Sequence, residues 1–140
     1  MKSGSESDVR AGLQEILDRL APGRFRCINR KTAGESVIGK PVDLEIATVE
    51  ESPRAAVAVE VANVNTTQLV GETCRLYYDT CPRKLLVLGD RNVPLGGRAQ
   101  CEMLLARLYG QSSIENTPAR VVSYSDDEGA IRALKALLLL

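Results

Sequence analysis

The segment from Ala55 to Val64 restricts the fold of this chain more than any other part of the sequence. In an extended strand Val57, Val59 and Val61 fall on one face. The other face carries alanines and Glu60. A strand that is apolar on both faces is typical of the centre of a sheet that is covered on each side. The segment therefore predicts a covered central strand.

The segments before this strand predict one helix and two further strands. Apolar residues recur at helical spacing in the first of them, and this stripe consists of Val9, Leu13, Ile16, Leu17 and Leu20. Ser7 can cap the start of the helix, and Pro22-Gly23 ends it. Residues 24–31 and 42–49 are then predicted to be strands, with turn-forming residues between them.

The rest of the chain alternates between helices and strands. We expect helices that begin at Asn65 or Thr66, after Gly97 and after a capping box at residues 125–128, and strands at 84–89 and 119–124. The predicted order is α-β-β-β-α-β-α-β-α, an α/β (α+β) fold in which helices flank a mixed sheet. The 140 residues are expected to form one domain, with residues 1–7 as a flexible N-terminus.

Charge composition limits the kinds of partner and chemistry. Lys plus Arg and Asp plus Glu number 18 each, so net charge gives no argument for a polyanionic partner. Thirteen of the basic residues are arginines, which suit bidentate contacts with phosphate or carboxylate, although a GC-rich genome gives the same bias. The chain has no histidine, which excludes Ser-His-Asp and Cys-His catalysis.

The cysteines and the apolar segments predict an ordinary cytoplasmic domain. The four cysteines are Cys27, Cys74, Cys81 and Cys101, and none of them forms a C-x-x-C pair. We therefore expect neither a zinc site nor another cofactor. The cysteines are expected to be small buried side chains, with a disulfide as the alternative. No apolar run approaches the roughly 20 residues that span a bilayer. The first residues also lack the apolar stretch of a secretory signal. We therefore expect no membrane partner.

The order of elements, with acids on the second and third strands, resembles the restriction-endonuclease-like fold of the PD-(D/E)xK superfamily. In that family an Asp on the second strand and an Asp/Glu-x-Lys on the third hold a divalent metal for phosphodiester hydrolysis. The resemblance implies that Asp43 and Glu60 are the corresponding acids here. Glu15, on the first helix, is a candidate for a further acid.

The sequence departs from this family at Ala62, which stands where the family has its lysine. Losing that cation should cost several kcal/mol of transition-state stabilisation. Lys40 and Arg75 are two cations that could take its place. Asp43 and Glu60 could still hold Mg²⁺ or Mn²⁺ through oxygen ligands. The alternative is a solvated strand face for the first acid and a paired or rim carboxylate for the second.

Basic residues also gather around the first predicted strand. Alternation places Arg24, Arg26 and Arg30 on one face, with a spacing of about 6–7 Å that suits successive phosphates. Proteins that bind single strands also stack bases on aromatic side chains. The candidate nucleic-acid-binding residues are Arg24, Phe25, Arg26, Arg30, Lys31, Lys40, Tyr77, Tyr78, Arg83 and Lys84. Core packing beside a solvated sheet face is the alternative.

The C-terminal run Leu137–Leu140 is apolar around most of a helix end. One stripe can pack on the sheet, and the other is exposed unless a partner covers it. The run therefore predicts either a homodimer contact or an ordinary docked terminus.

Three features together indicate nucleic-acid binding without cleavage. They are a basic strand, an order of helices and strands that resembles that of nucleases, and a catalytic motif that lacks its lysine. In size, element order, the basic strand at 24–31 and the Leu-rich tail, the chain is also similar to the archaeal ThermoDBP-related single-stranded DNA-binding proteins of thermophiles. The main hypothesis is therefore a dimeric, non-catalytic binder of single-stranded DNA or RNA. The alternatives are a metal-dependent nuclease with Asp43 and Glu60 as ligands, and a protein-interaction subunit that assembles through the tail.

Overall fold

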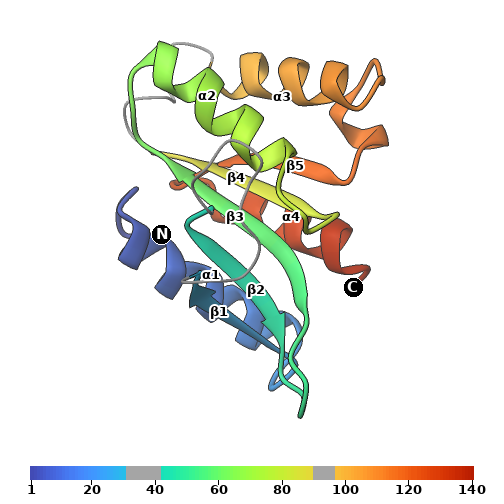
Figure 1. Cartoon of the computed structure of the whole chain (residues 1–140). Coiled ribbons are helices and arrows are strands. Elements are labelled where there is room, and N and C mark those ends of the chain that lie inside the picture. Colours follow the sequence, from blue (N-terminus) through green and yellow to red (C-terminus); the bar gives the residue numbers. More distant parts are fainter. Residues whose placement is uncertain (31–41, 90–96) are drawn as a thin grey trace.

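The computed structural model describes residues 1–30, 42–89 and 97–140. Within these residues four helices and five strands follow the predicted order, and one short 3-10 turn is added before the last strand. The strands form a mixed sheet in the order β1-β2-β3-β4-β5 (Figure 1). β1, β2 and β3 are an antiparallel meander, whereas β3, β4 and β5 are parallel. The predicted fold class is therefore confirmed.

The elements, in chain order, are α1 (Glu6–Leu20), β1 (Phe25–Asn29), β2 (Leu44–Thr48), β3 (Ala55–Ala62), α2 (Thr66–Tyr77), β4 (Lys84–Leu88), α3 (Gly97–Leu108), η1 (Ile114–Asn116), β5 (Ala119–Ser123) and α4 (Asp127–Leu138). No helix among the described residues is long and apolar enough to cross a bilayer.

The N-terminus differs from its prediction. Ser5 rather than Ser7 caps α1, because its hydroxyl accepts from the Asp8 N–H at 3.3 Å and the helix begins two residues earlier. The amino group of Met1 donates to the Tyr124 carbonyl at 3.1 Å. The first residues, expected to be flexible, therefore lie against the domain. Asp126 caps α4 from within the predicted capping box.

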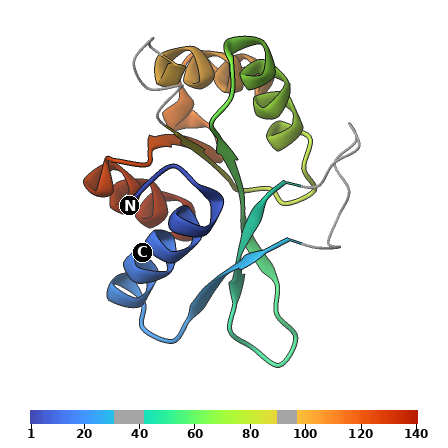
Figure 2. The same ribbon diagram turned by 90° about the vertical axis from the view of Figure 1, so that its left-hand side faces the viewer.

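Helices cover the two faces of the sheet unequally. α1 and α4 lie together on one face, and α2 and α3 lie over the other (Figure 2). The core under α1 and α4 consists of hydrophobic side chains, including the predicted central residues Val57 and Val59. α2 and α3 contact β3, β4 and β5. Within the described chain, β1 and β2 therefore have a face that no helix covers, which we call the open face.

The buried charged residues of the described chain all lie on the α2 side of the sheet. Glu45 and Lys84 both pair with Ala58, which belongs to the core under α2 and α3. Glu60 follows two residues after Ala58 and so points to the same side. The complete set is Arg30, Glu45, Glu60, Asp79 and Lys84. Because buried charges are costly unless they are paired, this side is where the structure is most constrained.

The outer edge of β1 is closed by a side chain of α1. Gln14 donates from Nε2 to the Phe25 carbonyl at 3.2 Å and accepts from the Cys27 N–H at 2.8 Å. The amide thus bonds the strand as a neighbouring backbone would, and it satisfies two groups that an edge strand otherwise leaves unpaired.

We expect Gln14→Ala to lower the free energy of unfolding by about 1–3 kcal/mol, because it leaves two part-buried backbone groups unsatisfied. Urea denaturation measures the change. Glu15→Ala is the control, since it removes only an exposed ion pair with Arg19 and should cost no more than about 1 kcal/mol. Equal losses in the two variants would contradict the role of Gln14.

Candidate functional site

The two acids predicted on the second and third strands lie beside each other. Leu44 pairs with Val59, which places Asp43, directly before β2, next to Glu60. Asp43 Oδ2 accepts a hydrogen bond from the Val61 N–H at 2.9 Å. Glu60 is 0% exposed, while Asp43 is half-buried. The β2–β3 pairing therefore brings Asp43 and Glu60 together.

The cation in contact with Glu60 comes from α2. Arg75 donates to Glu60 Oε2 from Nε at 2.8 Å and also from Nη2. Its Nη2 is also 3.9 Å from Oε1 of Glu72, one turn earlier on the helix. Of the two cations considered as substitutes for the missing lysine, Arg75 thus reaches the acid pair. Lys40 lies outside the described residues.

The surroundings of Glu60 raise the pKa of its carboxyl group. Burial is the main cause that raises the pKa of Glu60 to about 10, the neighbouring Asp43 raises it further, and Arg75 opposes the rise. Oε1 of Glu60 is buried and has no hydrogen-bond partner in the described part of the chain. The raised pKa of Glu60 and the contact with Arg75 both limit the negative charge that the two neighbouring acids place together.

This arrangement does not fit the divalent metal of the PD-(D/E)xK family. Mg²⁺ requires about six oxygen ligands in octahedral geometry, whereas here one oxygen of Glu60 already accepts two bonds from Arg75. No group of three Asp, Glu, Cys or His side chains in the described part of the chain could hold a metal ion. The site is an acid pair in contact with Arg75, with the methyl group of Ala62 buried in the core beside it.

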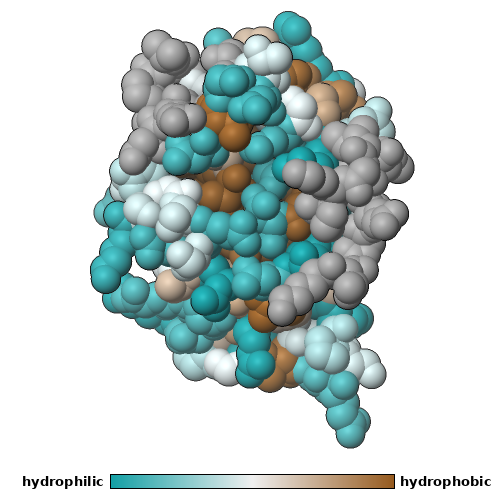
Figure 3. Space-filling model, turned by 60° about the vertical axis from the view of Figure 1, so that its left-hand side comes forward, coloured by the Kyte–Doolittle hydropathy of each residue, from teal (hydrophilic) through white to brown (hydrophobic). Residues whose placement is uncertain are grey.

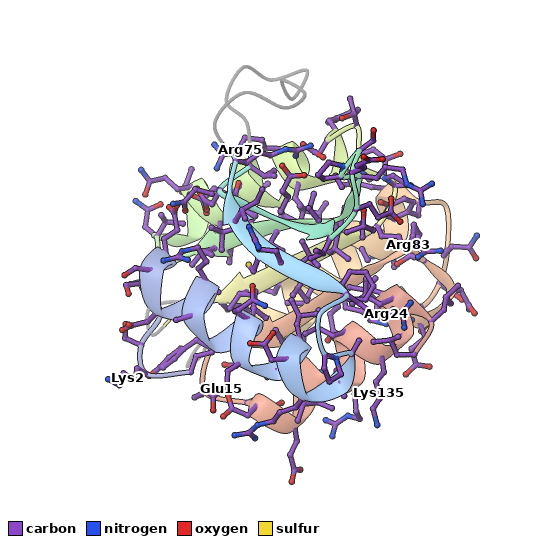
Figure 4. All side chains as sticks on the ribbon, turned by 90° about the horizontal axis from the view of Figure 1, so that it is seen from below. Lys2, Glu15, Arg24, Arg75, Arg83 and Lys135 are labelled. Atoms are coloured by element: carbon purple, nitrogen blue, oxygen red, sulfur yellow. The ribbon has the colours of Figure 1, made fainter. Side chains whose placement is uncertain are left out.

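Glu15 does not belong to this site. It pairs with Arg19 on the outside of α1, and Figure 4 shows it on the other side of the sheet from Arg75. The acid of α1 that approaches Asp43 is Glu6, whose pKa is raised by burial and then by Asp43. Glu6 was not among the predicted site residues, and its place in the first turn of a helix is the one signal that the sequence carries for it.

Arg30 is not available to a phosphate, contrary to the sequence prediction. It forms an ion pair with Asp79, and the two side chains are 2% and 0% exposed. Asp79 also accepts from the Cys81 N–H at 2.9 Å. The row of arginines is therefore broken, because the segment after α2 covers the end of β1 and supplies a carboxylate there.

Lys84 is likewise buried rather than placed for nucleic acid. Its Nζ donates to the Tyr77 carbonyl and lies 5.4 Å and 5.7 Å from the ring centroids of Tyr77 and Tyr109. Burial lowers the pKa of this amine. Tyr78 is exposed and packs edge-to-face on Tyr77, with 4.9 Å between centroids. Arg83 is half-buried.

Of the remaining candidates, Arg26 lies on the open face. Arg24 and Arg26 are exposed, whereas Phe25 is buried under α1 with the Arg24 guanidinium 5.3 Å from its ring centroid. A hollow of about 330 Å³ lies on this face, and it is lined by Arg26, Ile28, Ala47, Thr48, Val49, Glu50 and Pro53. In the view of Figure 3, small apolar patches on the surface are separated by hydrophilic residues.

The structure thus divides the predicted nucleic-acid residues into separate groups. Arg24 and Arg26 lie on β1 and the residue before it, whereas Tyr77 and Lys84 are packed together at the end of α2. Arg24 is also far from Arg75 in Figure 4. Lys31, like Lys40, lies outside the described residues.

The four cysteines are free thiols, as expected. Three are buried, and Cys74 is half-buried. Comparison of the chain with protein-family models, with curated proteins and with solved structures gave no significant match.

The raised pKa of Glu60 makes stability depend on pH. Between pH values near its ordinary pKa of 4.5 and its folded pKa of about 10, the folded protein holds a proton that the unfolded chain has released. The free energy of unfolding should therefore fall as pH rises through this range, by at most about 1.4 kcal/mol per pH unit from this group. The amide of Glu60→Gln has no such proton to lose.

Urea denaturation at several pH values checks this prediction. The wild-type protein should lose stability relative to Glu60→Gln as pH rises, and the variant should fold at neutral pH because its amide can still meet Arg75 and Asp43. Parallel pH curves for the two proteins would show that Glu60 is ionised in the fold.

Proposed function

We propose that this chain binds single-stranded nucleic acid, DNA or RNA, on its open face and does not cleave it. The observation that carries the proposal is the hollow on the open face, which has Arg26 at its side and the apolar surface of Ile28 and Val49 in its lining. Exposed Arg24 lies two residues before Arg26, in the turn that precedes β1.

The chemistry of this face suits a single strand better than a duplex. Arginine contacts phosphates, and apolar side chains contact the faces of bases that are not stacked in a helix. The hollow is within the roughly 300–1,000 Å³ range of ligand pockets, so it has room for one unstacked base. Glu50 at the rim and the zero net charge favour modest affinity over tight, non-specific binding.

The absence of cleavage rests on the acid pair. Metal-dependent hydrolysis of a phosphodiester needs an ion between the acids, whereas Glu60 is buried, has a raised pKa and is in contact with Arg75. A nuclease remains the second candidate because Asp43 and Glu60 lie side by side. That function requires cleavage in Mg²⁺ or Mn²⁺ that is lost in Asp43→Asn.

Arg26→Ala should weaken binding of a labelled oligo-dT or oligo-U, measured by fluorescence anisotropy at several salt concentrations. Affinity should fall steeply with salt, and losing one phosphate contact should reduce the slope of log K against log salt by about 0.7. The control is Arg19→Ala, which removes the same charge from an exposed position on α1.

An affinity that is independent of salt, or equal losses in the two variants, would refute binding on the open face. Arg30→Ala is unsuitable for this test. It removes one partner of a buried ion pair and should cost about 3–5 kcal/mol of stability whatever the protein binds.

We also propose that the chain forms a homodimer through the end of α4. Leu137 and Leu138 are buried in the core, whereas Leu139 and Leu140 are 76% and 39% exposed. Two exposed leucines in succession form an apolar end that a second copy would cover.

Light scattering tests the assembly. The full chain should be a dimer, and Leu139→Glu should be a monomer with unchanged affinity for the oligonucleotide. Lys135→Glu changes an exposed residue of the same helix and should remain dimeric. A monomeric full chain would rule out this contact.

A further inference from the structure

We propose that the free edge of β5 binds an extended acidic segment of a partner protein as an added strand. The site is a cleft of about 280 Å³ whose lining comes from α3, η1, β5 and α4. β5 is the last strand of the sheet, whereas the open face lies over β1 and β2 at the other end. The inference therefore goes beyond nucleic-acid binding and concerns a second surface.

Alternate residues of β5 direct their backbone groups away from β4. The Lys84 N–H donates to the Pro118 carbonyl at 2.9 Å. The Tyr124 N–H donates to the Leu88 carbonyl at the same distance. In a parallel ladder this pattern turns the even-numbered residues of β5 toward β4. The backbone groups that face the free edge are therefore those of Ala119, Val121 and Ser123.

The chain closes this edge at its two ends but not in the middle. The Ala119 N–H donates to Thr117 Oγ1 at 3.2 Å, and the Ala119 carbonyl accepts from Arg120 Nη1 at 2.7 Å. The Ser123 carbonyl accepts from the Asp126 N–H at 3.0 Å. The edge groups left without a partner within the described residues are the N–H and carbonyl of Val121 and the N–H of Ser123.

The helices beside this edge make it a groove that suits a single extended chain. α3 contributes Arg98 and Glu102 to the lining, and α4 contributes Arg132. α3 and α4 lie over opposite faces of β5, so the strand forms the floor between them (Figure 2). An unpaired strand edge is a template for strand addition. The edge of a second copy is set back in the same way, so it fits the groove less well than one extended segment.

The charges in the cleft favour an acidic segment. Arg132 is exposed and forms no ion pair within the described chain. The bonds that Arg120 donates there all go to backbone carbonyls, so no carboxylate balances its charge. Arg98 already meets two carboxylates, at 3.6 Å and 3.7 Å. Against the two unbalanced arginines, the described lining sets one acid without an ion pair, Glu115.

Strand alternation determines which segment fits. Val121 belongs to the core under α2 and α3, and Val122 belongs to the core under α1 and α4. The residue of an added strand opposite Val121 therefore points to the side of Ile114, and its two neighbours point to the side of Arg132. A segment in which apolar and acidic residues alternate suits both sides.

The test uses a blocked heptapeptide, Glu-Val-Glu-Val-Glu-Val-Glu, and follows binding and amide hydrogen exchange by NMR. In the free chain the Val121 amide should exchange faster than the Val122 amide, which bonds to β4. Saturating peptide should slow exchange at Val121 at least about tenfold. The same peptide with lysine in place of glutamate should bind at least about tenfold more weakly.

Two variants and a modified peptide test the two kinds of contact separately. Arg132→Glu reverses a charge of the cleft and should weaken binding of the glutamate peptide at least about tenfold. Lys135→Glu is the control, because it makes the same reversal at an exposed residue of α4 outside the cleft and should bind as the wild type does. N-methylation of the central valine removes the N–H that meets the Val121 carbonyl and should weaken binding about tenfold.

Several results would overturn the proposal. They are no binding of the glutamate peptide, unchanged exchange at Val121, equal affinity for the lysine peptide, and equal affinities of Arg132→Glu and Lys135→Glu. Protection of Val121 that rises with protein concentration alone would show that a second copy covers the edge. Protection of Val121 by oligo-dT would assign the cleft to nucleic acid. Because the open face is followed by other amides, failure here is distinguishable from failure of nucleic-acid binding.

Discussion

The contact between Arg75 and Glu60 is the interaction on which the α2 side of the domain depends. It allows the central strand β3 to carry an acid that is 0% exposed, and it attaches α2 to the sheet. A second ion pair, between Arg30 and Asp79, joins the end of β1 to the segment after α2. Because a buried polar or charged group is costly without its partner, these two contacts hold α2 and the meander in one arrangement.

In that arrangement the α2 side of the sheet has one part that helices cover and one part, the open face, that no helix of the described chain covers. Under α2 the charged groups satisfy one another, with Lys84 held against Tyr77 and Glu60 in contact with Arg75. Over β1 and β2 no helix of the described chain covers Arg26 and the hollow beside it. The α2 side of the sheet thus combines a buried acid pair in contact with Arg75 and, over β1 and β2, a hollow beside Arg26.

Sequence periodicity predicted helices such as α1 and α4 well because each buries a regular apolar stripe, and the continuous apolar run of β4 is buried on both faces. Periodicity could not predict which polar residues of a strand are covered. Alternation predicts the face of the sheet on which Arg30 lies, but not the distant segment that covers Arg30 there. Its partner Asp79 is 49 positions away. For Glu60, a paired carboxylate was one of the alternatives left open, and the structure supplies the pair. Proximity of Glu6 to Asp43 likewise depends on packing between distant segments.

The most direct test of binding without cleavage is an NMR titration of the labelled protein with a single-stranded oligonucleotide in the presence of Mg²⁺. We predict shifts of the backbone amides of Arg26, Ile28, Ala47 and Thr48, small changes at Glu60 and Arg75, and an oligonucleotide of unchanged length. Shifts centred on Asp43, Glu60 and Arg75, together with a shortened oligonucleotide, would contradict the proposal and indicate a working nuclease.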